Sequence, residues 1–276
     1  MKELTPKNDI IFKKIFGSKG NEDILKDLIS AILEEDIKEV EIQKDMQLEK
    51  IDINDKTGIL DIKALTNDNV QVNIEMQIVN QQNMEKRTLF YWSKLYTQGI
   101  HEGEMFHKLK KTITINLLDF NYFDTKQYHT KWHIVEDIEK DKILTDVLEI
   151  HFIELKKFIQ TNKMPENNKE HWLYFIDNTK REMVNMATEK NKIIGKAKEE
   201  LDYLTGDEEM KRMAELREKG IRDYNSGMAY AEEKGMQKGE QKTKIEVVKE
   251  MLKKGFSIEL IAEITKLSKA EIQKLK

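Results

Sequence analysis

Residues 58–79 read GILDIKALTNDNVQVNIEMQIV, in which apolar and polar residues alternate on both sides of the polar turn Asn67-Asp68-Asn69. This alternation is typical of two strands that each have one buried face. A three-residue turn predicts an antiparallel hairpin in which residues equidistant from Asp68 face each other. Ile62 then faces Ile74, and the apolar side chains share one side. A slip of one residue would move all of them to the other face, so the pattern specifies this register.

The other side of the hairpin gathers polar groups. The same register places Asp61 opposite Glu75 and Lys63 opposite Asn73, with Gln77 next on this face. Directly opposed residues have Cβ atoms roughly 4.5 to 5.5 Å apart, where two carboxylates repel each other. A hard divalent cation such as Mg²⁺ would compensate them. Lys63 is an alternative source of positive charge, and a solvated polar face neutralised by nearby lysines is an equally ordinary interpretation.

Composition sets broad limits on the protein class. The chain has 276 residues, of which 39% are hydrophobic, enough for one large domain or a domain with an appendage. Its net charge is -4, so any contact with nucleic acid has to be local. It contains no cysteine, which excludes disulfides and fits a reducing compartment. No apolar run approaches the ~18 residues of a membrane span, and no signal peptide is visible, so we expect a cytoplasmic protein without a membrane partner.

Further elements surround the hairpin in a definite order. The periodicity predicts an amphipathic helix over 22–35, a strand over 38–48, a helix over 83–100 and a strand over 111–119. A short helix capped by Asn8 or Asp9 precedes them and ends at Gly17. The helix between the last two strands makes a crossover connection, which predicts a parallel strand pair. The resulting order is αβββαβ.

The helix over 83–100 would lie beside the polar face of the hairpin. Arg87, Tyr91 and Lys94 share one stripe of this helix. Arg87 would be able to hold a phosphate by bidentate donation, although an arginine on a helix surface is more often solvated or paired.

Two smaller features lie downstream. His129 and His133 have the spacing of a helical metal pair, but the flanking residues favour strands over 131–137 and 143–153, which argues against zinc. Lys108, Lys110 and Lys111 form a local basic cluster before the strand over 111–119.

The remainder of the chain is predicted to be helical. A charged run over 180–254 contains several glycines, which weaken a helix, and reads as a linker. The tail over 245–275 has a stop at Gly255 and a capping box from Ser268 to Glu271, and it is similar to a helix-turn-helix. Its lysines would suit phosphates, but contact with a second copy of the chain and packing within one chain are equally good interpretations.

Asp61 followed by Glu75-Met76-Gln77 resembles the PD-(D/E)XK nuclease superfamily, with glutamine where lysine is usual. The opening segment 8–17 and the pattern Arg87-x3-Tyr91-Trp92-Ser93-x2-Tyr96 resemble one branch, the recombination-promoting nuclease or putative transposase family. The resemblance implies an α/β (α+β) fold with a restriction-endonuclease-like αβββαβ core, a mixed sheet flanked by helices and a helical C-terminal extension. We expect a nuclease domain over 1–180, a charged helical linker over 181–240 and a small helical tail over 241–276.

The resemblance also implies a divalent-metal-dependent DNA endonuclease that uses Mg²⁺ or Mn²⁺. Asp61 and Glu75 would be metal ligands, Gln77 would orient a water or a phosphate oxygen, and Lys63 would supply the missing positive charge. An additional acid is expected from the first helices, either Asp9 or Glu22, although helix capping or a place in the first turn is the alternative role of these residues. Arg87, Tyr91 and Lys94 would contact DNA. The alternative function is a catalytically degenerate DNA-binding or assembly protein of mobile-element origin, and self-association through the helical C-terminal region is compatible with both.

Overall fold

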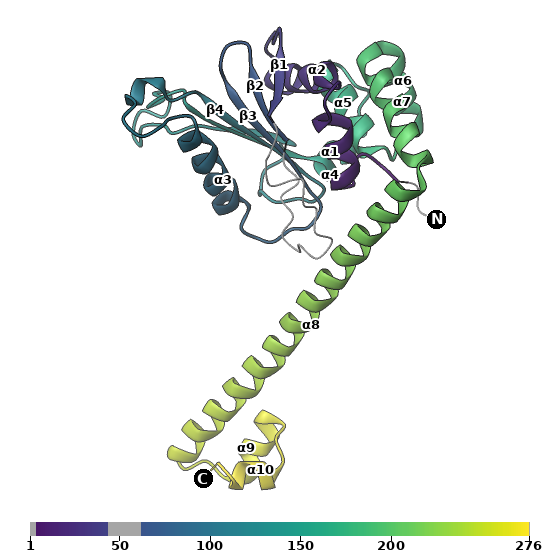
Figure 1. Cartoon of the computed structure of the whole chain (residues 1–276). Coiled ribbons are helices and arrows are strands. Elements are labelled where there is room, and N and C mark those ends of the chain that lie inside the picture. Colours follow the sequence, from purple (N-terminus) through teal and green to yellow (C-terminus); the bar gives the residue numbers. More distant parts are fainter. Residues whose placement is uncertain (1–3, 44–61, 276) are drawn as a thin grey trace. The chain divides into compact units, whose positions relative to one another are not determined.

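The computed structural model describes residues 4–43 and 62–275 (Figure 1). Asp61 and the first part of the quoted hairpin lie outside these residues. The chain divides into two compact units, residues 1–219 and 220–276. In the described part of the chain, no helix combines the length and the apolar character that a membrane span requires.

The first unit is built on a six-stranded mixed sheet in the order β1-β2-β3-β4-β6-β5. The strands are β1 (Val40–Gln43), β2 (Ile62–Thr66), β3 (Gln71–Gln77), β4 (Thr112–Leu118), β5 (His129–Trp132) and β6 (Leu148–Glu154). Strands β1, β2 and β3 form an antiparallel meander, β4 is parallel to β3, β6 is parallel to β4, and β5 is antiparallel to β6. With helices on both faces, this sheet confirms the predicted restriction-endonuclease-like fold class.

The hairpin register follows the prediction wherever the structure describes it. Ile62 pairs with Ile74 and Lys63 pairs with Asn73. The turn closes through a hydrogen bond from the Asn69 N–H to the Thr66 carbonyl, 2.9 Å long. Asn69 has a φ of 64°, a left-handed conformation that asparagine tolerates better than most residues. The parallel pairing of β3 and β4 confirms the predicted crossover.

One face of the sheet carries the main apolar core. The helices that contribute to it are α1 (Asp9–Gly17), α2 (Glu22–Leu33), α4 (Leu155–Gln160), α5 (Asn168–Asp177), α6 (Arg181–Lys190) and α7 (Lys192–Gly206). The Asn8 side chain caps α1 by accepting from the N–H groups of Ile10 and Ile11. A Cβ atom at Gly17 would lie 3.2 Å from Ile62 Cγ1, so glycine lets the end of α1 approach β2 closely.

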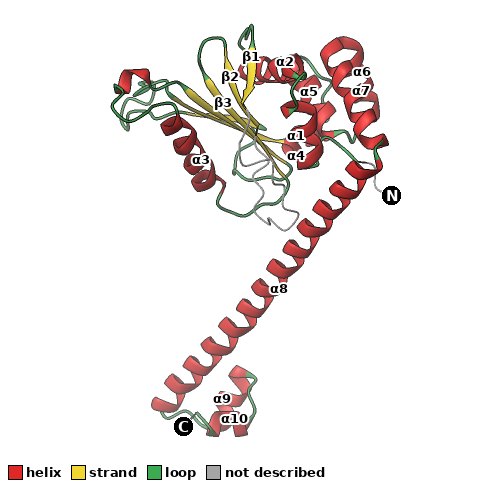
Figure 2. Cartoon of the chain, in the orientation of Figure 1, coloured by secondary structure: helices red, strands yellow, loops and turns green. Residues whose placement is uncertain are grey.

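The opposite face is covered by α3 (Met84–Gln98), which Figure 2 shows on the side of the sheet away from α1 and α4. A smaller apolar cluster joins this helix to β4 and β6 through Met84, Leu118 and Phe152. The Trp92 indole N–H donates to the Thr112 carbonyl at 2.8 Å and fixes the middle of the helix against β4. The short 3₁₀ helix η1 (Phe106–Lys108) leads from α3 to β4.

The region expected to be a linker begins inside the main core. Val184 and Ala187 of α6 and Ile194, Ala197 and Leu201 of α7 are all buried there. The predicted boundary at residue 180 therefore falls within the packed unit. These apolar residues recur at helical spacing, but the many lysines and glutamates between them made the segment look like a solvated helix.

The strands expected over 131–137 and 143–153 also differ in their bounds. The regular strands are β5 and β6, and only an isolated bridge between Val135 and Ile143 remains of the expected turn-proximal pairing.

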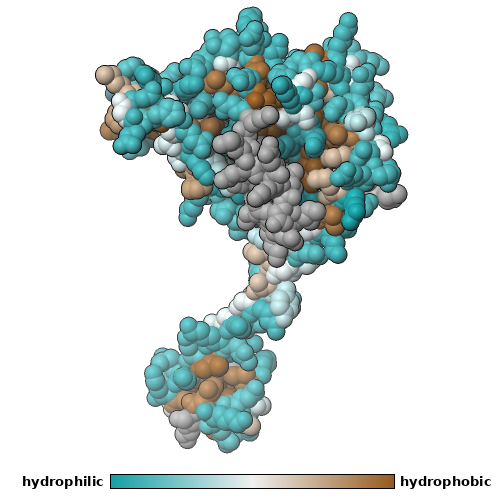
Figure 3. Space-filling view, in the orientation of Figure 1, coloured by the Kyte–Doolittle hydropathy of each residue, from teal (hydrophilic) through white to brown (hydrophobic). Residues whose placement is uncertain are grey.

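The second unit consists of the later part of α8 (Glu208–Lys253) and the helices α9 (Ile258–Thr265) and α10 (Lys269–Gln273). Val248, Ile261 and Ile272 form its small core. The predicted capping box between Ser268 and Glu271 is present. On the face drawn in Figure 3, this unit carries a group of apolar side chains.

Candidate active site

Glu75 lies on the polar face of β3 and is 3% exposed. Successive side chains of a strand point to opposite faces, so Val72, Ile74 and Met76 enter the main core while Glu75 faces α3. Burial of a carboxylate without a partner is costly, and the groups around Glu75 therefore define what this site can do.

Two N–H donors converge on one oxygen of Glu75. Arg87 Nη2 of α3 lies 2.5 Å from Glu75 Oε1, and the Gln77 side-chain amide donates to the same oxygen. The Arg87 guanidinium carbon also lies 5.0 Å from the centroid of the Tyr91 ring, a favourable position for a cation over an aromatic face. Arg87 thus supplies positive charge where the sequence predicted that the carboxylate needs it. Hydrogen bonds between charged groups are the strong ones.

Two buried oxygen atoms beside Glu75 have no hydrogen-bond partner among the described residues. They are Asn73 Oδ1 on β3 and Thr114 Oγ1 on β4. The two residues are direct neighbours in the β3–β4 pairing and share the face of Glu75. Buried polar atoms without partners are rare in native proteins and point to a bound water or ion.

These oxygens fit the ligand chemistry of a hard divalent cation. Carboxylate, amide and hydroxyl oxygens are the donors that Mg²⁺ and related ions prefer. Within the described residues, no three His, Cys, Asp or Glu side chains are grouped closely enough to hold a metal. A cation at Glu75 would therefore use Asn73, Thr114 or Asp61, and Asp61 lies outside the residues described.

A hydrogen-bonded pair fixes α3 over the site. The Asn116 side-chain amide on β4 donates to Thr88 Oγ1 at 2.9 Å and to the His151 carbonyl at 3.1 Å. Asn116 is the β4 neighbour of Glu75, and Thr88 directly follows Arg87. This contact positions the guanidinium over the carboxylate.

The other predicted site residues lie in several places. Lys63 is half-buried on β2 and pairs with Asn73 in the ladder. Lys94 is exposed on α3. Asp9 is buried, and its carboxylate pairs with Arg217 Nη2 at 2.6 Å, while the Glu22 carboxylate accepts from the Gly20 N–H. Neither acid has a hydrogen bond or ion pair to Glu75 in the described parts of the chain.

Sequence reasoning placed Asn73 on the polar face without giving it a role, and it missed Thr114, Thr88 and Asn116 as parts of this site. A signal for three of them was present. Thr112, Thr114 and Asn116 are polar residues at alternate positions of β4, and Asn73 precedes Glu75 by two residues. Polar residues that keep the same parity in two neighbouring strands share a face.

A separate polar cluster lies on the other side of the sheet. His129 Nε2 lies 2.8 Å from His151 Nδ1, and His151 Nε2 lies 2.7 Å from Glu149 Oε1. Burial lowers the pKa of His129 to about 3, and burial also lowers the pKa of His151. Burial alone would raise the pKa of Glu149, but hydrogen bonds from His151, Lys131 and Lys111 outweigh it and hold the pKa below its ordinary value. The two histidines with the spacing of a metal pair therefore have different partners. His129 contacts His151, and His133 Nδ1 lies 3.1 Å from the Leu148 carbonyl oxygen.

Comparison with family models gives a match over most of the chain. Residues 6–231 match the family described as PD-(D/E)XK nuclease family transposase. The chain belongs to this family, as the resemblance implied. Comparison with curated proteins and with solved structures gave no significant match.

Proposed function

We propose that the chain is a divalent-metal-dependent DNA endonuclease of the recombination-promoting nuclease type, which hydrolyses phosphodiester bonds. The observation that carries this proposal is Glu75, a buried carboxylate in a member of a nuclease family. Two N–H donors contact it, and two oxygens on the same face have no hydrogen-bond partner in the described part of the chain. A bound Mg²⁺ or Mn²⁺ would lower the pKa of a water molecule and stabilise charge on the phosphate.

The residues of the site divide into oxygen ligands and N–H donors. Glu75, together with Asp61, would hold the cation, with Asn73 and Thr114 as further oxygens on the same face. Arg87 has five N–H donors in a fixed plane, so it is able to hold Glu75 and a phosphate oxygen at the same time. The Gln77 amide has a second N–H for the same purpose.

Gln77 stands where the superfamily usually has lysine, and its neighbours explain how the site would function without that charge. A glutamine donates a hydrogen bond but carries no positive charge. Arg87 lies against the same carboxylate oxygen and supplies a permanent charge there. We therefore assign Arg87, rather than Lys63, as the main compensation for the missing lysine.

Cleavage of supercoiled plasmid tests the proposal. Purified protein is incubated with the plasmid in Mg²⁺, in Mn²⁺ or in EDTA, beside the variant Glu75→Gln. The matched control is Glu189→Gln, which makes the same change at an exposed position of α6. We expect nicked and linear products that require the metal, are lost in Glu75→Gln and persist in the control. Cleavage in EDTA, or equal cleavage by both variants, would contradict the proposal.

The alternative is a catalytically degenerate DNA-binding or assembly protein, and two observations favour it. Glu75 already has a partner in Arg87, and the usual lysine is replaced. This function predicts DNA binding without cleavage in either metal, with equal affinity in Glu75→Gln and in the wild type.

A further inference from the structure

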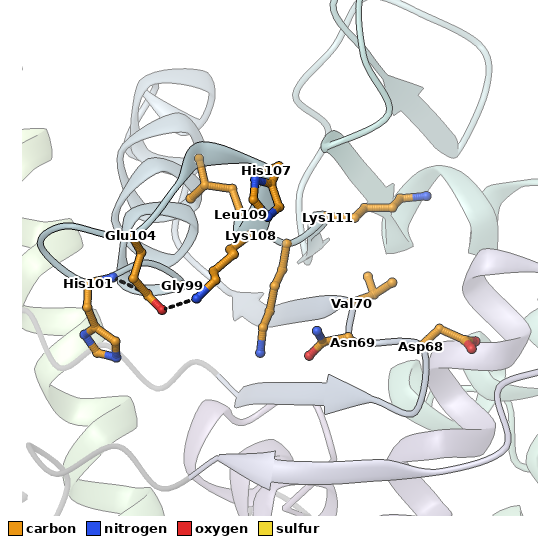
Figure 4. A pocket seen from close by; sticks show the side chains of 11 residues that line it. Asp68, Asn69, Val70, Gly99, His101, Glu104, His107, Lys108, Leu109 and Lys111 are labelled. Carbon is orange, nitrogen blue, oxygen red and sulfur yellow. Dashed lines mark hydrogen bonds and ion pairs between the residues drawn. The ribbon is translucent and has the colours of Figure 1, made fainter.

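A second site lies at the other end of α3. It is a pocket of about 660 Å³ between the hairpin turn, the end of α3 and the loop before β4. Figure 4 shows Asn69 and Val70 on one side of it and the side chains of His101, Glu104 and Lys108 on the other. The basic cluster noted in the sequence forms part of its lining.

The loop that forms this pocket is held in place by its own hydrogen bonds. The Glu104 carboxylate accepts from the His101 backbone N–H at 2.8 Å and from Lys108 Nζ at 2.9 Å. Lys111 pairs with Glu149 at 3.0 Å. Lys108 and Lys111 are thus both ion-paired, whereas Lys110 forms no ion pair within residues 4–43 and 62–275.

The same loop exposes two large apolar side chains that precede Lys108 in the chain and lie outside the residues that line the pocket. Phe106 is 83% exposed and Met105 is 68% exposed. An exposed aromatic ring close in sequence to lysines offers an apolar surface for a sugar of the DNA backbone, and the lysines offer positive charge for the phosphates.

The helix α3 connects this pocket to Glu75. Arg87 near its beginning contacts Glu75, and Gly99 directly after its end lines the pocket. Tyr91 follows Arg87 by four residues and Lys94 follows Tyr91 by three, so all three lie on the same stripe of the helix. In the sheet, the pocket lies beside the pairing of Gln71 with Thr112, whereas Glu75 pairs with Asn116 four residues further on. This separation is roughly 13 Å at the usual rise of a strand, a distance of about four nucleotides along DNA.

We propose that this pocket binds the phosphate backbone of the DNA strand that runs along α3 from Glu75, with Lys108 and Lys110 as phosphate contacts and Phe106 as an apolar contact for a sugar. The choice of DNA as the ligand of this pocket rests on the proposed function. It adds a binding site that is separate from the site of hydrolysis.

Binding of a short fluorescein-labelled DNA duplex, followed by anisotropy across a series of salt concentrations, tests this site. All proteins carry Glu75→Gln and are measured in EDTA, so the result does not depend on cleavage. Each phosphate contact that is lost should reduce the slope of log affinity against log salt by about 0.9. We expect Lys108→Ala/Lys110→Ala to reduce the slope by about twice this amount, and the single variant Lys110→Ala, which breaks no ion pair, by about one such step.

The matched control is Lys126→Ala/Lys156→Ala, which removes two exposed lysines outside the pocket. Phe106→Ala should weaken binding without changing the slope, because an apolar contact with a sugar releases no counterions. If Lys110→Ala and the double variant have the affinity and slope of the control, the proposal is wrong. That result would leave the proposed hydrolysis at Glu75 untouched, since plasmid cleavage is measured independently.

Discussion

The two faces of the sheet arise from the same strands but differ in what covers them. On one face, Val72, Ile74 and Met76 of β3 contribute to a core to which six helices add residues. On the other face, Asn73, Glu75 and Gln77 lie under α3, with only a small apolar cluster further along. Because side chains alternate along β3, neighbouring residues belong in turn to the apolar core and to the candidate site. The buried Glu75 carboxylate is stabilised by the Arg87 guanidinium, which α3 places against it.

A charge introduced on the apolar face of β3 should have the largest effect on stability. Ile74→Asp places an unpaired charge in the apolar core, where Ile74 is fully buried. The cost of several kcal/mol per buried ion is comparable with a typical total stability of about 5 to 15 kcal/mol. We expect loss of cooperative thermal unfolding by circular dichroism. Leu89→Asp, on the exposed surface of α3, is the control and should unfold as the wild type does.

The ion pair on the polar face gives the next largest effect. Arg87→Ala leaves the buried Glu75 carboxylate without its charged partner, which costs about 3 to 5 kcal/mol for a buried pair. In a Glu75→Gln background the same substitution should cost much less, because no charge is left behind. Urea unfolding of the two single variants and the double variant measures this coupling. Additive effects would show that Arg87 stabilises the protein independently of Glu75.

The pH dependence of stability distinguishes the buried histidines from the carboxylate site. The pKa of His129 is lowered by burial from 6.5 to about 3, so the folded protein keeps it neutral while the unfolded chain takes up a proton. Its contribution is complete above about pH 6.5 and is lost as the pH falls toward 3. His151, Lys131, Lys169 and Glu34 are the charged or titratable groups that act on it.

We therefore expect the melting temperature to fall between about pH 7 and pH 5, and to fall less in His129→Asn. The exposed His107→Asn is the matched control. An unchanged pH profile in His129→Asn would show that His129 does not titrate in this way.

Much of this architecture could be predicted because it depends on local periodicity. The alternation about Asp68 specified the hairpin, and the crossover rule specified the parallel pairing of β3 and β4. The contact between Glu75 and Arg87 was not predictable, because it depends on how α3 lies across the strands. The sequence analysis also did not predict that α6 and α7 belong to the core. Their apolar stripe is narrow, and the many charged residues around it indicated a solvated helix. The pairing of Asp61 with Glu75 stays a prediction.

Substitution of Gln77 tests how much the polar face contributes to the proposed cleavage beyond the Glu75 carboxylate. A neutral hydrogen bond contributes roughly 0.5 to 1.5 kcal/mol, and one to a charged group about 1.5 to 3 kcal/mol. Gln77→Ala should therefore slow plasmid cleavage by about ten- to a hundredfold, whereas Gln77→Lys should remain active beside Glu75. Cleavage rates at one Mg²⁺ concentration decide this. A loss as large as that of Glu75→Gln would indicate that Gln77 has a structural role or binds the metal itself.

The smallest expected effect on stability comes from the unpartnered hydroxyl of Thr114. Thr114→Val removes a buried oxygen that has no partner in the described residues and keeps the shape of the side chain. An unsatisfied hydroxyl contributes no hydrogen bond to folding, so the free energy of unfolding should be unchanged or slightly higher. Thr88→Val makes the same replacement at a hydroxyl that is bonded to Asn116, and it should cost about 1 kcal/mol.

If the Thr114 oxygen serves a bound cation, Thr114→Val should nevertheless raise the Mg²⁺ concentration needed for half-maximal cleavage. Urea unfolding and a Mg²⁺ titration of both variants separate the two contributions. Destabilisation of Thr114→Val by as much as Thr88→Val would mean that its hydroxyl is hydrogen-bonded in solution.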